Sequence, residues 1–128
     1  MGYRSEVALT LTKQDALRLL DEAANASETA SEFLGYAKLI KHSDEYVTFY
    51  WDWVKWYDGY EDVDFVNAFC SKLLDEDRDY AFKRIGEDNE DYESFFNGDY
   101  AIDECVEFAR RFETDWNAET TAEELMKR

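Results

Sequence analysis

The sequence predicts an α+β fold, a ferredoxin-like sandwich whose largely antiparallel sheet carries two helices on one face and an added C-terminal strand or hairpin. Short segments alternate apolar and polar residues, as half-buried strands do, and two longer segments repeat apolar residues at helical spacing. These segments follow one another as strand, helix, two strands, helix and further strands. The 128 residues fit a single domain spanning positions 1–128.

The chain begins with a predicted strand and helix. Residues 6–12 alternate, with Val7, Leu9 and Leu11 on one side, which is the period of a strand. The hydroxyl of Thr12 can cap the first turn of the helix that follows. The apolar face expected for this helix consists of Leu17, Leu20 and Ala24.

Two further strands are expected before the second helix. Residues 27–34 predict a bent continuation of the first helix, which Gly35 would end. Residues 36–40 then predict a second strand, and the polar residues 42–45 predict a turn. The third strand, over residues 47–53, has the clearest alternation and is expected to lie centrally against the helices. Its expected core side chains are Val47, Phe49, Trp51 and Trp53.

The second half of the chain predicts a helix capped by Asp62, followed by a hairpin of residues 80–85 and 91–97. Residues 104–113 fit either a strand or a helix, and we favour the strand. Residues 117–128 predict a short C-terminal tail helix. The apolar stripe of the second helix consists of Val66, Phe69, Cys70 and Leu73.

The charge of the chain is its most informative feature for function. Thirty-one acidic residues against 14 Lys and Arg give a formal net charge of −17, although 45% of the residues are hydrophobic. Nine Phe, nine Tyr and four Trp indicate a folded domain with a negative surface rather than a disordered acidic tail. Such a surface favours a partner with a basic binding face and disfavours direct contact with nucleic acid or with a membrane.

The remaining composition points to a cytoplasmic protein without catalytic machinery. The sequence has neither an apolar run long enough to span a membrane nor a signal peptide pattern. Cys70 and Cys105 are therefore expected as buried thiols rather than as a disulfide. His42 is the single histidine and lies beside a predicted turn, and no phosphate-binding loop or Cys/His metal set is present, so we expect no enzyme and no cofactor.

Three segments together resemble a family of small proteins encoded by tailed bacteriophages. They are residues 1–7 (MGYRSEV), residues 54–57 (VKWY) and residues 84–88 (RIGED), the last followed by 91–93 (DYE). Proteins of this family mostly lack an assigned activity, so the resemblance implies a phage origin and an α+β fold and carries over no catalytic residues. A phage origin favours a protein that disarms or redirects a host machine.

These observations predict a protein that inhibits a host nucleic-acid-handling or defence complex by nucleic-acid mimicry. A compact domain of this length is about 36 Å across, and duplex DNA of that length carries about 21 phosphate charges. The net charge of −17 is of the same order, although acidity also serves solubility alone. The residues expected to bind the partner are Asp58, Glu61, Asp62 and Asp64 (the first acidic patch), Glu87, Asp88, Glu90, Asp91 and Glu93 (the second acidic patch), and the aromatic residues Trp56, Tyr57 and Tyr60.

Two alternatives from other classes remain open at this point. Glu87, Asp88 and Asp91 could hold Mg²⁺ or Mn²⁺ in a divalent-metal phosphoesterase, although a turn offers neither fixed geometry nor a substrate pocket. The outward aromatic residues could instead join copies of a phage scaffolding protein. Arg84, which lies among many carboxylates, is expected to form internal ion pairs.

Overall fold

The computed structural model describes residues 3–57, 59–88, 90–109, 111–113 and 119–120. An open antiparallel sheet forms its centre, with the strands in the order β5-β4-β1-β3-β2-β8. The α+β class and the antiparallel sheet are thereby confirmed. The strands are β1 (Ser5–Thr12), β2 (Lys38–Lys41), β3 (Tyr46–Val54), β4 (Tyr80–Ile85), β5 (Tyr92–Asn97) and β8 (Glu119–Thr120).

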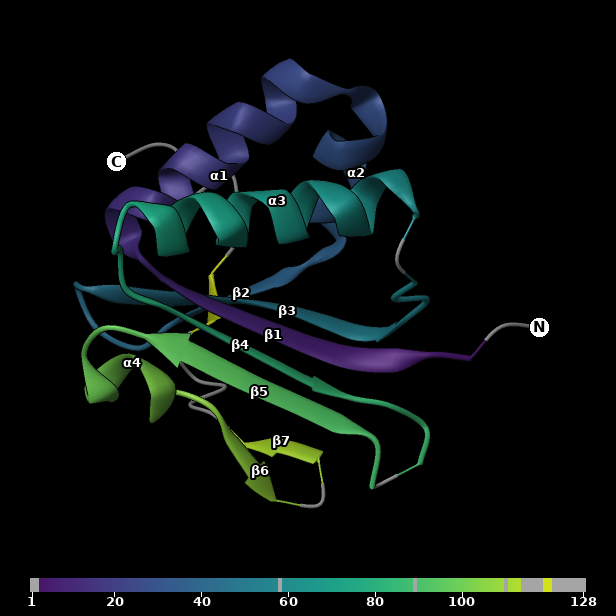
Figure 1. The fold of residues 1–128 in the computed structure, drawn as a ribbon, viewed down its shortest axis with the longest axis vertical. Coiled ribbons are helices and arrows are strands. Elements are labelled where there is room, and N and C mark those ends of the chain that lie inside the picture. The colour runs from purple at the N-terminus through teal and green to yellow at the C-terminus, as the bar shows by residue number, and fades with distance from the viewer. Residues whose placement is uncertain (1–2, 58, 89, 110, 114–118, 121–128) are drawn as a thin grey trace.

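Helices cover one face of this sheet, and a short helix and a hairpin lie beyond its other side (Figure 1). The three longer helices lie together over the first face, with α3 running roughly along the strands. The elements outside the sheet are α1 (Lys13–Ala26), α2 (Glu28–Tyr36), α3 (Glu61–Asp75), α4 (Tyr100–Asp103), β6 (Glu107–Ala109) and β7 (Arg111–Glu113).

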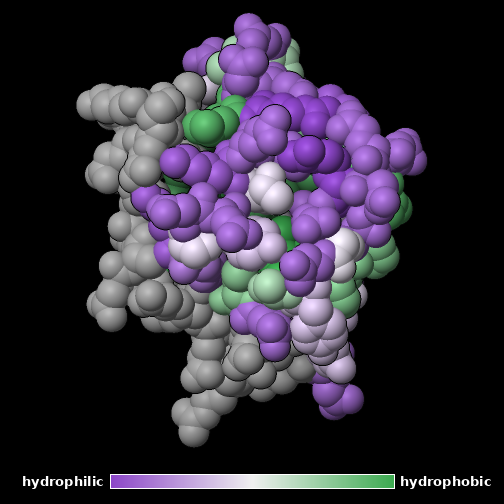
Figure 2. All heavy atoms as spheres, turned by 90° about the vertical axis from the view of Figure 1, so that its left-hand side faces the viewer, coloured by the Kyte–Doolittle hydropathy of each residue, from purple (hydrophilic) through white to green (hydrophobic). Residues whose placement is uncertain are grey.

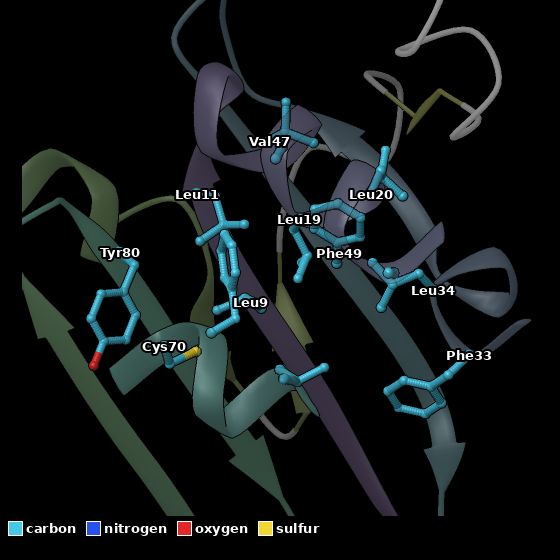
Figure 3. Packing of buried hydrophobic residues seen from close by; sticks show 14 of the residues in the cluster. Leu9, Leu11, Leu19, Leu20, Phe33, Leu34, Val47, Phe49, Cys70 and Tyr80 are labelled. Carbon is cyan, nitrogen blue, oxygen red and sulfur yellow. The ribbon is translucent and has the colours of Figure 1, made fainter. Parts of the chain in front are cut away.

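The strand β1 is buried on both sides because both faces of the sheet are covered. Val7, Leu9 and Leu11 enter the main core beneath the helices, part of which Figure 3 shows. Ala8 faces the other way and joins a smaller cluster that includes Val106 from the C-terminal segment. The alternation predicted for β1 is confirmed. One face of the strand packs into the main core and the other into the smaller cluster, so neither face is exposed to solvent.

The helix α1 starts as predicted but buries a different face. The backbone N–H of Asp15 donates to Thr12 Oγ1 at 3.2 Å, which confirms the N-cap. The side chain of Asp15 is itself buried and accepts a hydrogen bond from Arg78 Nε at 2.9 Å, so a charged residue forms part of the buried face of this helix. The prediction for Ala24 is wrong, since Ala24 is exposed, whereas Leu17 is partly buried and packs against the core. The buried residues of α1 are Asp15, Ala16, Leu19, Leu20 and Ala23.

Residues 28–36 form a separate helix, α2, rather than the bent continuation that the sequence predicted. The backbone of Ser27 is extended, and Ser27 Oγ accepts a hydrogen bond from the N–H of Ala30 at 3.0 Å, which starts the new helix. Gly35 lies inside α2, which ends only at Tyr36. The first face therefore carries three helices where two were expected.

The strand β3 has the central position predicted for it, but its alternation fails near its end. Ser5 of β1 pairs with Val54 and Val7 pairs with Trp51, so β3 carries one extra residue relative to β1. Trp53 lies in this bulge at φ 65° and is 44% exposed, whereas Trp51 is 1% exposed. The prediction of a core position for Trp53 is therefore wrong.

The helix α3 confirms the predicted apolar stripe, all of which is buried. Tyr60, rather than Asp62, is its N-cap residue and forms no side-chain cap hydrogen bond, so that prediction is wrong. Both cysteines are free thiols, with Cys70 buried and Cys105 half-buried. Burial raises the pKa of Cys70 to about 12 and that of Cys105 to about 11.

The hairpin of β4 and β5 is confirmed, and the segment 104–113 contains the two short strands β6 and β7, as the strand interpretation predicted. The buried ammonium of Lys83 holds this segment against the sheet. It donates to the carbonyl oxygen of Asp103 at 2.6 Å and to that of Val106. The ammonium of Lys83 thus connects β4 to the backbone at the end of α4 and just after it, on the face of the sheet opposite the three longer helices.

Only Glu119–Thr120 of the predicted tail helix 117–128 is described, and these two residues pair with β2 as β8. The remainder of that prediction lies outside the described residues. In the described part of the chain, no helix has both the length and the apolar composition that crossing a bilayer requires.

Candidate protein-interaction surface

Both acidic patches lie at one end of the sheet. Glu6 pairs with Ile85, and Ile85 pairs with Tyr92, so β1 begins where β4 finishes and β5 begins. The first turn of α3 follows the end of β3 and reaches the same end, where Figure 1 marks the N-terminus. We call this the acidic end and define it by Glu61, Asp62, Asp64, Glu87, Asp88, Glu90, Asp91 and Glu93, whereas Asp58 of the first acidic patch lies outside the described residues.

The second acidic patch is tied to the start of the chain. Tyr3 Oη donates to Asp91 Oδ2 at 2.7 Å and accepts from the backbone N–H of Asp88 at 3.1 Å. The backbone N–H of Arg4 donates to Glu87 Oε2 at 2.7 Å. Gly86 permits this close approach, because a Cβ there would lie 2.2 Å from Tyr3 Oη. The turn between β4 and β5 is therefore held by hydrogen bonds to the residues that precede β1.

Arg84 organises the carboxylates of this patch. Its Nη2 donates to Asp91 Oδ1 at 2.8 Å and its Nε donates to Glu93 Oε1 at 2.7 Å. Its Nη1 donates to the buried Ser5 Oγ at 2.9 Å. Burial acts to lower the pKa of Arg84, but the hydrogen bonds that it donates to Asp91 and Glu93 outweigh this effect, and the pKa is raised. The internal ion pairs predicted for Arg84 are confirmed.

Asp91 links the acidic end to the pH dependence of stability. Hydrogen bonds from Arg84 and then from Tyr3 lower its pKa below the ordinary value, so the folded protein binds this proton less readily than the unfolded chain. The resulting stabilisation is complete above a pH of about 4 and is lost as the pH falls towards the lowered folded-state pKa.

We therefore expect the difference in unfolding free energy between the protein and Asp91→Asn to be constant from about pH 8 to about pH 5 and to shrink below about pH 4. Urea unfolding across that range measures it. In a Tyr3→Phe background, Asp91 keeps Arg84 as a donor but loses Tyr3. The stability difference caused by Asp91→Asn should then depend less on pH. A difference that does not change with pH would contradict the assigned cause.

The described residues of the first acidic patch lie at the start of α3, and one of them bonds the loop that joins β3 to α3. Asp64 Oδ1 accepts a hydrogen bond from the N–H of Gly59 at 3.0 Å, and Asp62 Oδ1 accepts one from the N–H of Val63 at 2.8 Å. Glu61 is exposed. All three carboxylates lie in the first turn of α3, where the helix dipole stabilises negative charge.

The three aromatic candidates differ in their accessibility. Trp56 is half-buried, and its ring lies 5.9 Å from that of Phe33 and 5.7 Å from that of Phe82, so it contributes chiefly to the core. Tyr57 Oη accepts a hydrogen bond from the backbone N–H of Tyr3, which joins the two acidic patches. Tyr60 packs edge-on against Tyr57 at 5.3 Å and remains 45% exposed. Tyr60 is thus the most accessible aromatic contact of the three.

A pocket of about 350 Å³ opens beside the second acidic patch, which contributes Asp91 and Glu93 to its lining. Such a volume lies at the lower end of the range typical of ligand sites. Aromatic rings from three separate segments form its walls, and polar groups complete its lining. The aromatic residues are Tyr3, Trp56, Tyr57 and Phe82, and the polar residues are Asn67, Arg84, Asp91 and Glu93.

This pocket was not predicted from the sequence, because Tyr3, Asn67 and Phe82 come from three separate segments of the chain. The alternation of β4 does place Phe82 and Arg84 on the same face, and this was the available signal. Their meeting with Tyr3 depends on a hydrogen bond between residues 88 positions apart, Tyr3 and Asp91.

The residues suggested for metal binding have other partners. Asp91 is bonded to Arg84 and Tyr3, and Glu87 accepts from the backbone of Arg4. Asp88 Oδ1 accepts from the backbone N–H of Glu90 at 2.9 Å. Within the ranges that the structure describes, no group of three or more His, Cys, Asp or Glu side chains is placed to hold a metal ion.

The opposite end of the molecule, which faces the viewer in Figure 2, is also largely hydrophilic. There Arg18 bonds both oxygens of Glu76 at 2.8 and 2.9 Å, and Lys72 bonds Glu22 at 2.7 Å. Acidic residues are therefore present at both ends of the sheet. At this end their cationic partners lie on the helices, whereas at the acidic end Arg84 of β4 pairs with Asp91 and Glu93.

Comparison of the chain with protein-family models, with curated proteins and with solved structures finds no match.

Proposed function

We propose that this chain is a phage-encoded, non-enzymatic protein that inhibits a host nucleic-acid-handling or defence complex by nucleic-acid mimicry. The observation that carries the proposal is the gathering of both acidic patches at one end of the sheet, around shared contacts of Tyr3 with Tyr57 and Asp91. In the proposed complex, these carboxylates occupy the positions that phosphates take in a basic binding channel.

The geometry of the acidic end supports mimicry better than it supports general solubility. Solubility requires only that charges be exposed, whereas a mimic must hold them in fixed positions against their mutual repulsion. Here Glu87 and Asp91 have defined hydrogen-bond partners, and Asp64 is tied to the loop before α3. The net charge of −17 also favours fast association with a basic partner and weaker binding at high salt.

The test is binding to the captured host protein. The chain is immobilised, host proteins that bind at about 50 mM salt and leave at about 300 mM salt are purified, and the dissociation constant of each is measured. We expect the variant Glu61→Lys/Glu90→Lys to bind its target about tenfold or more weakly and with a smaller salt dependence, because both side chains are exposed at the acidic end.

The matched control is Asp44→Lys/Glu45→Lys, which makes the same change in net charge in the exposed turn between β2 and β3 at the opposite end. It should retain most of the affinity. Equal losses in both double variants would contradict a localised site. Simultaneous binding of duplex DNA and this chain to the captured protein would contradict mimicry.

We further infer that the fold is a ferredoxin-like sandwich. The order β1, α1, β2, β3, α3, β4 and the strand arrangement β4-β1-β3-β2 support this assignment. In this interpretation α2, β5 and the C-terminal elements are additions to that plan.

A further inference from the structure

The pocket at the acidic end has walls that suit a flat cation. The rings of Trp56 and Phe82 lie 5.7 Å apart at an angle of 35°, and Trp56 remains half-buried. Tyr3 and Tyr57 complete the aromatic lining. Aromatic faces carry a negative quadrupole, so they attract ammonium and guanidinium groups and offer little to an anion.

The charges of the pocket favour the same class of ligand. Asp91 and Glu93 contribute two carboxylates, and Arg84 contributes the one cation among its lining residues. Every guanidinium nitrogen of Arg84 already donates to a protein oxygen, on Glu93, Ser5 or Asp91. Arg84 is therefore engaged with internal carboxylates and is a poor anchor for an incoming anion.

The pocket also contains hydrogen-bond acceptors that the protein itself leaves open. Arg84 bonds Glu93 Oε1, whereas Glu93 Oε2 receives no hydrogen bond from any described residue. Glu93 is exposed and so can be reached from solvent. The side-chain amide of Asn67, which projects from α3 into the same lining, likewise makes no hydrogen bond to the described part of the chain.

We propose that this pocket binds an arginine side chain of the partner protein, with the guanidinium against the aromatic walls and its N–H groups directed to Glu93 and Asn67. Arginine fits better than lysine, because a guanidinium is planar, weakly hydrated and able to reach two separate acceptors while it stacks. The inference rests on the proposed function only for the identity of the molecule that carries the arginine. The pocket itself can be tested without that partner.

The test uses methylguanidinium as the probe and follows the intact protein by NMR. We expect saturable shifts of the Trp56 indole N–H and the Asn67 side-chain amide, with a dissociation constant in the millimolar range expected for so small a ligand. Methylammonium at the same concentrations should bind at least about threefold more weakly. Shifts that rise linearly without saturation, or equal binding of both probes, would overturn the assignment.

Glu93→Gln and Glu90→Gln form a matched pair of variants for this measurement. Both remove one negative charge near the turn between β4 and β5, but only Glu93 lines the pocket. We expect Glu93→Gln to weaken methylguanidinium binding about three- to tenfold and Glu90→Gln to leave it nearly unchanged. Equal weakening in both variants would show a general charge effect and would overturn the inference.

The two proposals fail in distinguishable ways. If methylguanidinium saturates the pocket but no basic partner binds at the acidic end, the proposed function is wrong and the arginine pocket stands. If a basic partner binds with the expected salt dependence while methylguanidinium shows no saturable binding to the pocket, the proposed function stands and the arginine pocket is wrong.

Discussion

Replacement of Trp51 by alanine is expected to lower the free energy of unfolding by about 3–5 kcal/mol, a large fraction of the stability of a domain of this size. The side chain is 1% exposed and stacks on Phe33 at 4.8 Å with nearly parallel rings. Its Nε1–H donates to the carbonyl oxygen of Phe33 at 2.9 Å, which fixes α2 to β3. Alanine would leave a cavity between the helices and the sheet as well as an unpaired carbonyl.

The measurement is urea unfolding followed by far-UV circular dichroism, with Trp53→Ala as the control. The two tryptophans are close in sequence, but Trp53 is 44% exposed, so its replacement should cost about 1 kcal/mol or less. Trp51→Phe provides a second comparison, since it retains a stacking ring but removes the N–H donor and part of the ring volume, so its cost should be smaller than that of Trp51→Ala. Similar losses for Trp51→Ala and Trp53→Ala would contradict the register that we describe for β3.

Replacement of Arg84 by methionine is expected to lower the free energy of unfolding by about 2 kcal/mol and to disorganise the acidic end. Loss of one partner of a fully buried ion pair costs about 3–5 kcal/mol, and we reduce that figure because the carboxylates are partly solvated. Arg84 is 13% exposed, whereas Asp91 and Glu93 are 39% and 55% exposed. Methionine fills much of the same volume but removes the hydrogen bonds from Arg84 to Asp91, Glu93 and Ser5, which leaves Asp91 with Tyr3 as its remaining side-chain donor.

A double-mutant cycle with Asp91→Asn checks this expectation. If Arg84 acts through Asp91, Arg84→Met should cost less in the Asp91→Asn background than in the parent protein. Arg84→Lys restores the charge but cannot bond Glu93, Ser5 and Asp91 together, so its cost should be intermediate. Additive costs in the cycle would mean that Arg84 stabilises the fold by some route other than Asp91.

The spacing of apolar residues along the chain correctly predicted those elements whose buried face follows from that spacing alone. The alternation of β1 and the apolar stripe of α3 are properties of contiguous residues, and the apolar face of β1 and the whole stripe are buried as expected. The bulge at Trp53 could not be predicted in this way, because it exists only relative to β1. The buried face of α1 was missed for a similar reason, since the ion pair of Asp15 with Arg78 joins residues 63 positions apart.

In the candidate site too, the local composition could be predicted from the sequence, whereas the long-range contacts could not. The acidic character of the turn between β4 and β5 and of the start of α3 is plain in the sequence, as is the aromatic run that precedes α3. Whether the two patches meet depends on Tyr3, which had no distinguishing local pattern. Its contacts with Tyr57 and Asp91 are made across 54 and 88 positions of the chain.

These contacts of Tyr3 make the proposed binding surface a discontinuous epitope. The opening residues, the loop before α3 and the turn after β4 each contribute a part, and no short contiguous peptide from the chain contains all three. Short synthetic fragments should consequently be poor competitors for the target. Recognition should also disappear in the same cooperative transition that separates the strands, so heat or urea would inactivate and unfold the protein together.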